Sequence, residues 1–273
     1  MEQTKPYSLS SAPDTEEKKR YTANAIDKTL SVIDILAKGE ASYTDILQAL
    51  HLPKATLHRI LQSLEEHEYI SRNDVTDRYS LGIKFIYYGA VVKSDISIVS
   101  IAAPHMQSLA TSIGERVSMS MLYHDMAVGL VSFEGESSVL ISRLIPVAPL
   151  NASASGKLFL SYMSDEKICS YFESSMWERT TVNSICSYDS FKAEQKKILQ
   201  QGLSYDDEES EYGLYCMSIP LSNHEGILPV NMGITGPKSR IFMKGRDEIE
   251  KKLRQCAMDV NHTLQTLRYE FEY

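Results

Sequence analysis

Hydrogen-bond donors gather on one side of a short helix that the sequence predicts from Pro53 onward. Its apolar residues recur at helical spacing and should be buried; they are Leu57, Ile60, Leu61 and Leu64. The residues left for the exposed side are Lys54, Ala55, Thr56, His58, Arg59, Gln62 and Ser63. Side chains of these types bind base edges and phosphates in a DNA groove, and a small alanine fits against a thymine methyl. The helix is therefore a candidate DNA-reading element.

The charges of this helix are unevenly placed. Lys54 lies in the first turn, where the helix dipole disfavours a cation, whereas Glu65, Glu66 and Glu68 lie at the far end. An anion outside the protein would explain the position of Lys54. A solvated helix can show the same asymmetry by chance, so the pattern alone leaves both interpretations open.

A second candidate site begins in the segment ASASGK, residues 152–157. It resembles the tail of a phosphate-binding loop. However, Asn151 stands where that motif has glycine, and Leu158 stands where it has the serine or threonine that binds magnesium, so nucleotide hydrolysis is not expected. The small residues open a predicted helix, whose free backbone amides at Ala154 and Ser155 can bind the carboxylate of a small organic acid. Alternatively, the helix start needs small residues only for packing.

Other reactive residues in the second half form no recognisable catalytic or metal motif. The run from Asp206 to Glu209 lacks the alternating ligand spacing of a calcium loop, and such runs usually face solvent or cap loops. Cys216 and the seven histidines match no Cys/His catalytic signature. The four cysteines lie at least 17 residues apart, which excludes a CxxC motif and is typical of reduced thiols. We expect no metal, cofactor or catalytic residue, and keep a cysteine-dependent enzyme as an alternative.

The DNA-reading helix should belong to a compact unit at residues 21–82, preceded by a disordered arm at residues 1–20. A first helix can begin at Asn24 and end at Gly39. Its apolar residues at helical spacing are Ile26, Leu30, Ile33 and Ala37. A second helix begins near Ser42, whose hydroxyl can cap it, with Asp45 three residues later and with Ile46, Leu47 and Leu50 facing inward.

A β-hairpin is predicted after the three helices. Residues 69–81 alternate apolar and polar side chains around an Asn-Asp turn, and Arg72 and Arg78 flank this turn. Three helices followed by a hairpin are typical of a winged helix-turn-helix, in which both arginines would contact phosphate or a minor groove. The expected DNA-binding residues are Ser42, Lys54, Thr56, His58, Arg59, Arg72 and Arg78.

Residues 83–95 are predicted to form a linker helix. Its segment 85–92, FIYYGAVV, carries no charge. A helix that is apolar on most of its faces must be covered on more than one side. The same helix of a second subunit would provide that cover, since most oligomers are symmetric. The alternative is burial between the two domains of one chain.

Residues 96–273 are predicted to fold as an α+β domain on an antiparallel sheet. The predicted helices cover residues 95–114, 155–164, 165–173 and 190–201, and a last helix buries Ile249, Leu253, Cys256, Val260, Leu264 and Leu267. The predicted strands cover residues 117–121, 127–133, 139–147, 214–221 and 229–235. Met119 and Met121 alternate with serines, and either methionine could line a ligand pocket or fill the core.

The overall composition describes an ordinary soluble protein of about two domains at roughly 150 residues each. The chain has 273 residues, 43% of them hydrophobic and 23% charged. No apolar run approaches the roughly 20 residues of a membrane span, and the start resembles no signal peptide, so we expect a cytoplasmic protein without membrane contact. The net charge is −8, and residues 20–82 hold seven basic and nine acidic side chains. DNA affinity should therefore need several domains together and should depend on salt.

Several motifs together resemble the IclR family of bacterial transcriptional regulators. In chain order they are AIDKTLSVIDIL, LHLPKATLHRILQSLEEHEYI, DRYSLG, PLNASASGKLFL, GLSYDDEESEYGLYCMSIPL and MGITGPKSR. The resemblance spans roughly residues 24–270. It implies a winged helix-turn-helix, a linker helix and a GAF-like effector domain, assembled as a homodimer or homotetramer on double-stranded operator DNA.

The resemblance also implies an effector pocket. It assigns Asp206 and Cys216 to this pocket, and Gly233 and Thr235 stand where family members often carry serines. Thr235 keeps a hydroxyl, whereas Gly233 leaves more room, so a sugar or aromatic acid fits as well as a short keto acid. The expected effector-binding residues are Met119, Ala154, Ser155, Asp206, Cys216, Gly233 and Thr235. We expect a regulator, acting as a repressor, that responds to a small carboxylate; the alternatives are a sensor without DNA binding and a cysteine-dependent enzyme.

Overall fold

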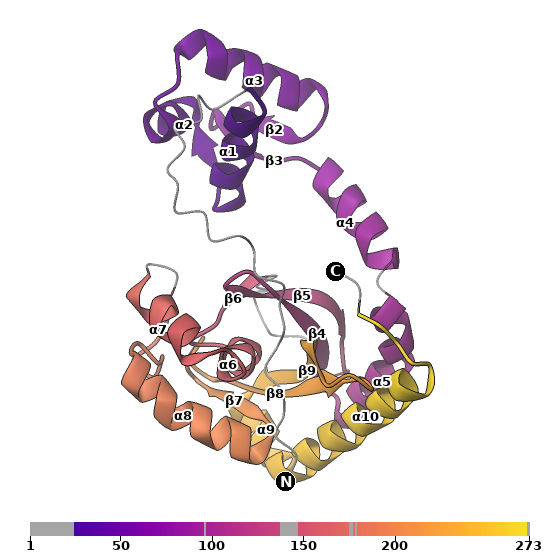
Figure 1. Ribbon diagram of the computed structural model, residues 1–273. Coiled ribbons are helices and arrows are strands. Elements are labelled where there is room, and N and C mark those ends of the chain that lie inside the picture. Colours follow the sequence, from indigo (N-terminus) through magenta and orange to yellow (C-terminus); the bar gives the residue numbers. More distant parts are fainter. Residues whose placement is uncertain (1–24, 96, 137–146, 175–176, 178, 272–273) are drawn as a thin grey trace. The chain divides into compact units, whose positions relative to one another are not determined.

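The computed structural model describes residues 25–95, 97–136, 147–174, 177 and 179–271 (Figure 1). The chain divides between residues 95 and 97 into two compact units. The predicted disordered arm, Asn24 and most of the predicted strand 139–147 lie outside the described residues. Within these ranges no helix combines the length and the apolar character needed to cross a membrane.

The N-terminal unit is a winged helix-turn-helix. Its elements are α1 (Ala25–Ala37), β1 (Ala41–Ser42), α2 (Tyr43–Leu50), α3 (Lys54–Glu66), β2 (Ile70–Asn73), β3 (Arg78–Leu81) and α4 (Lys84–Asp95). The three strands form one antiparallel sheet in the order β1-β3-β2, so the hairpin of β2 and β3 is the wing. The fold predicted from the order of helices and hairpin is confirmed.

A small apolar core holds this unit together. Its buried members are Val32, Leu36, Ala41, Ile46, Leu57, Leu61, Leu64, Ile70 and Tyr79. Helical spacing did not identify the buried side of α1: Ile26 is 68% exposed and Leu30 is 53% exposed, whereas Val32 and Leu36 are buried. Both sets follow helical spacing, so the pattern alone could not choose between them.

The two helices of the helix-turn-helix begin differently. Ser42 caps α2 in a capping box: its hydroxyl accepts from the backbone N–H of Asp45 at 3.2 Å, and its own N–H donates to the Asp45 carboxylate at 2.9 Å. The α3 helix follows Pro53, which supplies no side-chain cap. The prediction for Ser42 is confirmed as far as capping is concerned.

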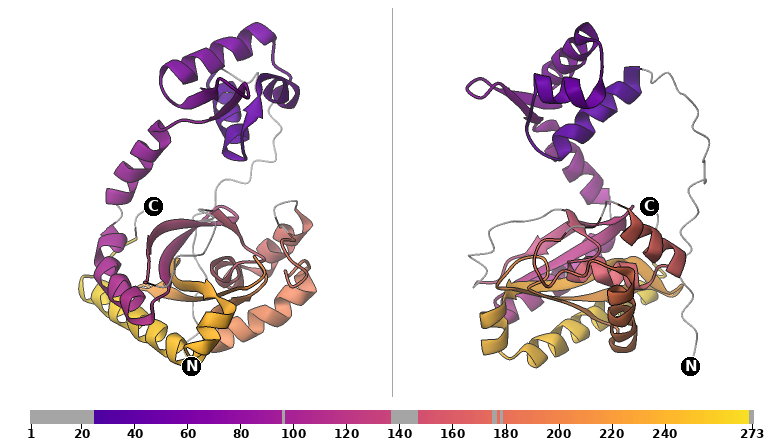
Figure 2. Two further views of the ribbon diagram at one scale, coloured as in Figure 1. Left: turned by 180° about the vertical axis from the view of Figure 1, so that it is seen from behind. Right: turned by 90° about the vertical axis from the view of Figure 1, so that its left-hand side faces the viewer.

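The C-terminal unit is built on one antiparallel sheet with helices on both sides. Its elements are α5 (Ser97–Ile113), β4 (Arg116–Tyr123), β5 (Met126–Phe133), β6 (Val147–Pro149), α6 (Ala154–Ser161), α7 (Asp165–Glu173), α8 (Tyr188–Gln201), β7 (Ser204–Asp207), β8 (Leu214–Ser222), β9 (Ile227–Pro237), α9 (Lys238–Met243) and α10 (Arg246–Thr266). The strand order is β6-β5-β4-β9-β8-β7. In Figures 1 and 2, α6 lies on one side of β8 and α10 on the other.

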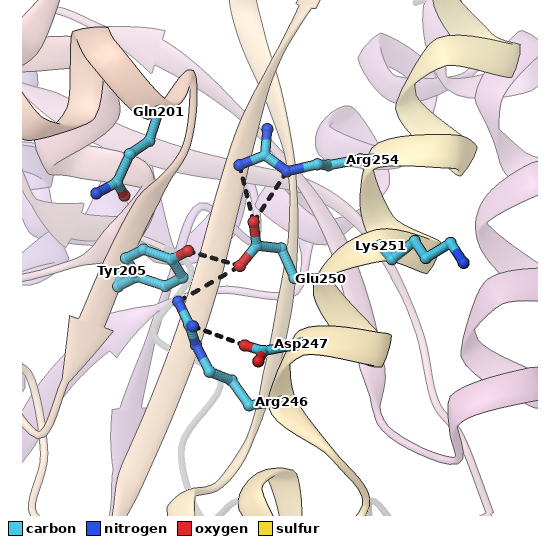
Figure 3. A pocket seen from close by; sticks show the side chains of 7 residues that line it. All are labelled: Gln201, Tyr205, Arg246, Asp247, Glu250, Lys251 and Arg254. Carbon is cyan, nitrogen blue, oxygen red and sulfur yellow. Dashed lines mark hydrogen bonds and ion pairs between the residues drawn. The ribbon is translucent and has the colours of Figure 1, made fainter.

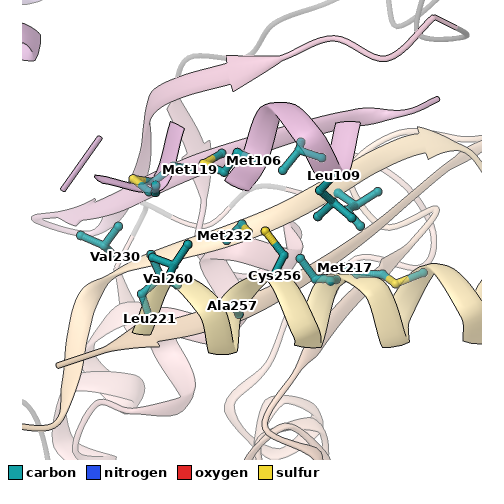
Figure 4. Packing of buried hydrophobic residues seen from close by; sticks show 14 of the residues in the cluster. Met106, Leu109, Met119, Met217, Leu221, Val230, Met232, Cys256, Ala257 and Val260 are labelled. Atoms are coloured by element: carbon teal, nitrogen blue, oxygen red, sulfur yellow. The ribbon is translucent and has the colours of Figure 1, made fainter. Parts of the chain in front are cut away.

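The two sides of this sheet differ in chemistry because side chains alternate along each strand. One side packs against α5 and α10 and is filled by residues such as Val117, Met217 and Met232 (Figure 4). We call it the apolar face. Most of the predicted buried residues of α10 lie there, but Leu267 follows the end of the helix and is exposed.

The opposite side of the sheet, covered by α6, is the polar face. Its residues are Arg116, Ser118, Ser120, Ser204, Asp206, Cys216, Ser218, Asn231, Gly233 and Thr235. The helices α7 and α8 lie beside α6 and share a separate apolar cluster with it, including Phe159 and Phe191. Four of the predicted effector residues, Asp206, Cys216, Gly233 and Thr235, lie on this face.

Candidate functional site

The exposed side of α3 carries the predicted DNA-reading side chains. Lys54, His58 and Arg59 are exposed, and Thr56 is half-buried, whereas the leucines of the opposite side lie in the core. In the described part of the chain, none of these four side chains forms a hydrogen bond or an ion pair with the protein. The Tyr43 hydroxyl donates to the carbonyl of Lys54 at 3.0 Å and so fixes the start of α3 on α2. The helix thus presents side-chain donors that have no partner among the described residues, and its start is held against α2.

The two arginines of the wing are both paired within the unit. Arg72 forms an ion pair with Asp77, which raises the pKa of the arginine. Arg78 donates to the carbonyl of Glu40 at 2.8 Å and lies 3.4 Å from the carboxylate of Asp45. Arg78 therefore ties the wing to the start of α2. A phosphate at either arginine would have to share the guanidinium with an acid already present.

The tip of the wing is acidic rather than basic. Asp74 and Asp77 lie in the turn between β2 and β3, on either side of the exposed Val75 and Thr76. The side-chain oxygen of Asn73 accepts from the backbone N–H groups of Val75 and Thr76 and closes the turn. This turn brings no uncompensated cation to DNA, which leaves α3 as the main candidate for contact.

Four residues form a row across the polar face. Asp206, Cys216, Thr235 and Arg116 lie directly opposite one another on β7, β8, β9 and β4. Residues opposite one another on neighbouring strands point to the same side of a sheet, with Cβ atoms about 5 Å apart. The structure therefore brings three of the predicted effector residues together. It adds Arg116, which the sequence analysis missed.

A second row lies beside the first. Ser204, Ser218, Gly233 and Ser118 are opposite one another on the same four strands. Ser204 and Ser218 are buried, and their hydroxyl oxygens have no hydrogen-bond partner among the described residues. Alternation of serine with apolar residues on β4 and β8 was the signal that could have found this row.

Asp206 orders the loop that follows β7. Its carboxylate accepts from the backbone N–H of Glu209 at 2.8 Å, from that of Ser210 at 3.2 Å, and from the Ser210 hydroxyl. Burial raises the pKa of this carboxyl group above its usual range. Asp206 thus receives hydrogen bonds from its own chain.

Cys216 lies between Asp206 and Thr235 in the first row. Burial raises its pKa well above the usual range, and the neighbouring carboxylate of Asp206 adds to the effect. The thiolate is the nucleophilic form of cysteine, so such a thiol is unreactive at neutral pH. This environment speaks against the alternative of a cysteine-dependent enzyme.

The start of α6 keeps both properties expected of it. Ser153 caps the helix by accepting from the N–H of Gly156 at 2.9 Å, and the amides of Ala154 and Ser155 have no hydrogen-bond partner in the described ranges. A Cβ atom on Gly156 would lie 2.3 Å from the carbonyl oxygen of Pro149, so this position must be glycine for packing. The Ser155 hydroxyl lies 3.3 Å from the amide oxygen of Asn231 on the polar face.

A buried lysine connects α6 to the loop after β7. The Lys157 amino group lies 2.5 Å from the Glu209 carboxylate and 3.6 Å from that of Glu194. Burial raises the pKa of Glu209 to about 7; Lys157 opposes this shift, and the neighbouring acids Asp206 and Glu194 add to it. Sequence reasoning considered Lys157 only as part of a phosphate-loop motif, and no local signal indicated a partner 52 residues away.

The prediction that Met119 lines the pocket was wrong. Met119 lies opposite Met232 and is buried in the cluster of the apolar face. Its neighbours Ser118 and Ser120 point the other way. The predicted effector residues Ala154, Ser155, Asp206, Cys216, Gly233 and Thr235 all lie on or against the polar face.

A separate surface pocket of about 480 Å³ lies between β7 and α10 (Figure 3). Its lining residues are Gln201, Tyr205, Arg246, Asp247, Glu250, Lys251 and Arg254. The charged groups largely neutralise one another: Glu250 accepts from Tyr205 at 2.6 Å and from Arg254 at 2.9 Å. Tyr205 points away from its neighbour Asp206, so this pocket is distinct from the polar face.

Comparison with known proteins gives a consistent result for both units. A family model described as "Bacterial transcriptional regulator IclR C-terminal" matches residues 90–262, and one described as "IclR helix-turn-helix domain" matches residues 25–74. The DNA-binding transcriptional repressor YiaJ of Escherichia coli (strain K12) is 28% identical over 256 residues, which cover 91% of each chain.

Two solved structures share the fold. The IclR protein of Thermotoga maritima has a TM-score of 0.62 at 26% identity, and the match covers 88% of this chain and 98% of that one. An IclR homologue of Microbacterium hydrocarbonoxydans, complexed with 4-hydroxybenzoate, has a TM-score of 0.68 at 15% identity with the same coverage.

Proposed function

The chain belongs to the IclR family of bacterial transcriptional regulators. We propose that it is a repressor whose affinity for operator DNA is controlled by a small organic acid. The helix-turn-helix unit would bind the operator, and the polar face of the C-terminal unit would bind the acid. The carrying observation is the exposed side of α3, where Lys54, His58 and Arg59 have no partner in the described part of the protein.

The DNA contacts proposed for α3 follow from its residue types. Arg59 can bind a guanine edge with two hydrogen bonds, and Thr56 and His58 can each bind a base or a phosphate. Lys54 lies at the uncapped start of the helix, where a phosphate would also meet free backbone amides. Ser42, Arg72 and Arg78 would support binding from the flanks, the two arginines by sharing their charge with the acids that they already contact.

A second subunit is proposed to cover α4 and to pair the recognition helices. Ile86, Tyr87 and Val91 on this helix are exposed. The inner end of α4 is held by Tyr69, whose ring meets Phe85 and whose hydroxyl lies 3.1 Å from that of Tyr88. Two helices that read one face of DNA must lie about 34 Å apart. A homodimer, or a homotetramer built from two such dimers, would provide that spacing.

The effector is proposed to lie over the polar face. The amides of Ala154 and Ser155, the hydroxyl of Thr235, and the side chains of Asp206 and Cys216 would hold it, and Gly233 would leave room beside them. Keto, sugar and aromatic acids are the candidate classes, and the complex of an IclR homologue with 4-hydroxybenzoate is an example of the last. Binding would shift the populations of subunit arrangements and so change the spacing of the recognition helices.

The DNA-binding part of the proposal is tested by Arg59→Ala. DNA fragments are first selected from a random-sequence pool with the wild-type protein, and each variant is then titrated against a selected fragment in a gel shift. Loss of a bidentate base contact should weaken specific binding by about 1–3 kcal/mol, which is roughly 5- to 150-fold. Binding to unselected DNA should change little.

Lys38→Ala is the matched control, since Lys38 is an exposed cation of the same unit that lies outside α3. It should lose less than Arg59→Ala. Equal affinity of Arg59→Ala and wild type for the selected fragment would remove α3 from the proposed interface. Failure of the wild type to select any sequence would favour a sensor without DNA binding.

A further inference from the structure

The residues predicted for the effector site include no cation that would balance the charge of a bound carboxylate. They include neutral donors and one carboxyl group, that of Asp206, whose pKa is raised by burial. Nearby, Lys157 is already shared between Glu209 and Glu194. A carboxylate that enters such a site loses hydration next to buried acids, which is costly unless a cation compensates.

Arg116 is placed to supply that cation. It is the first residue of β4 and lies directly opposite Thr235 on β9. Their Cβ atoms are therefore about 5 Å apart on the same face, and an arginine side chain easily spans that distance. The Arg116 side chain is only 12% exposed, so its charge acts in a partly desolvated environment.

Arg116 forms an ion pair with Glu134 in which the direction of the contact is poor. The Nε atom lies 2.6 Å from the Glu134 carboxylate, yet it forms no hydrogen bond in a proper direction. The Glu134 side chain follows the end of β5 and is 47% exposed. The buried Nε atom therefore has no well-directed hydrogen bond among the residues that the structure describes, and the acid beside it is partly exposed to solvent.

The ion pair between Arg240 and Glu115 in the same unit has a different geometry. Arg240 donates to both carboxylate oxygens of Glu115, each at 2.6 Å, and Lys244 donates to the same acid at 2.7 Å. The Glu115 side chain is fully buried. This bidentate geometry is what a permanent arginine-carboxylate contact adopts. Arg116 and Glu134 lack it.

We propose that Arg116 binds the carboxylate of the effector and that Glu134 occupies the arginine only until the effector arrives. This inference rests on the proposed effector site and adds its charge-recognising residue. It makes a negative charge on the ligand, rather than its hydrogen-bonding oxygens alone, the basis of recognition.

The test compares acids with their neutral amides. Pyruvate, D-gluconate and 4-hydroxybenzoate are titrated into the full-length protein alongside pyruvamide, D-gluconamide and 4-hydroxybenzamide, and binding is followed by calorimetry. The acid that binds wild type most tightly is then titrated into Arg116→Gln, Arg116→Lys and Glu134→Gln.

A charge-assisted contact predicts effects of opposite sign in the two partners. Arg116→Gln should bind the acid roughly 10- to 100-fold more weakly, while its affinity for the amide stays within about twofold. Arg116→Lys keeps the charge and should fall between Arg116→Gln and wild type. Glu134→Gln should bind the acid more tightly than wild type, because it removes the competing carboxylate.

Arg254→Gln is the matched control, because it removes an arginine from an ion pair with Glu250 at the separate pocket of Figure 3. It should leave the affinity for the acid unchanged. An acid affinity of Arg116→Gln equal to that of wild type would overturn the inference, as would equal weakening for acid and amide.

The proposed function fails in a distinguishable way. If none of the three acids binds wild type, the effector site proposed for these acid classes falls, and the role of Arg116 falls with it. If an acid binds wild type but ignores both substitutions, the effector site stands and only the role of Arg116 is lost. Specific DNA binding through α3 is measured separately and is affected by neither result.

Discussion

The two faces of the six-stranded sheet use the same strands for opposite purposes. On β9, Val230, Met232 and Ile234 enter the apolar face, whereas Asn231 and Thr235 belong to the polar face. The apolar residues are sealed between the sheet and two helices. The polar residues include buried hydroxyl groups that make no hydrogen bond in the described structure. Apolar packing and polar chemistry are thus separated by one residue along the chain.

The difference shows where the unit pays a cost in stability. Leaving a buried hydroxyl without a partner costs about 1–3 kcal/mol relative to a satisfied one. Such groups, here the hydroxyls of Ser204 and Ser218, occur on the polar face. Natural sequences depart from optimal packing mainly at functional sites, so this face is where a ligand is expected.

The largest effect should come from opening a cavity on the apolar face. Met232 is fully buried there, and Met232→Ala should lower the free energy of unfolding by about 2–5 kcal/mol. Urea unfolding of the full-length protein measures this loss. Met232→Leu keeps the volume and should lose less than about 1.5 kcal/mol. Similar losses in the two variants would mean that packing at this position contributes little.

A smaller and pH-dependent effect should come from the polar side. Burial raises the pKa of Glu209 to about 7, whereas an unfolded glutamate titrates near 4.3. The folded state therefore holds a proton that the unfolded state releases first. This contribution is present in full below about pH 4, and it is lost as the pH rises through about 7, by up to roughly 3 kcal/mol.

The comparison of wild type with Glu209→Gln isolates this contribution. The unfolding free energy of wild type should fall, relative to that of the variant, between pH 5 and pH 8. Acids that do not interact with Glu209 contribute equally to both proteins and cancel. Met232→Ala should follow the wild-type pH profile at a constant offset. Parallel profiles for wild type and Glu209→Gln would show that Glu209 has an ordinary pKa.

The smallest effect should come from deleting an unpartnered hydroxyl. Ser218→Ala removes a buried group that makes no hydrogen bond in the described structure, so stability should be unchanged or rise by up to about 1 kcal/mol. Ser161→Ala is the control, since the Ser161 hydroxyl is buried but donates to the carbonyl of Leu158 at 2.6 Å. That variant should lose about 1 kcal/mol. A greater loss in Ser218→Ala than in Ser161→Ala would contradict the contrast between the faces.

Local patterns were sufficient to predict most of the fold. Alternation on β4 and helical spacing on α3 each depend on neighbours a few residues away, and both elements were predicted correctly. The same information failed for Met119, because alternation says that methionines and serines face opposite ways but not which side holds the ligand. It also could not identify the buried side of α1, where the exposed Ile26 and Leu30 and the buried Val32 and Leu36 each follow a helical spacing.

The charge partners of the site could not be predicted from local patterns. Arg78 meets Glu40 and Asp45 across the first sheet, and Lys157 meets Glu209 across a helix and a strand. These contacts depend on strand register and on how the helices pack. Arg116 escaped notice for the same reason, since only the register of β4 with β9 places it beside Thr235.

The missing cap at the start of α3 has a consequence for motion. In α2 the capping box holds the first turn closed, whereas the amides of Lys54 and Ala55 have no acceptor in the described residues. Amide protons without an acceptor exchange with water without any opening of the fold. The first turn of α3 is thus the part of the helix with the least protected amides. A bound anion would supply the hydrogen-bond acceptor that no side chain provides there.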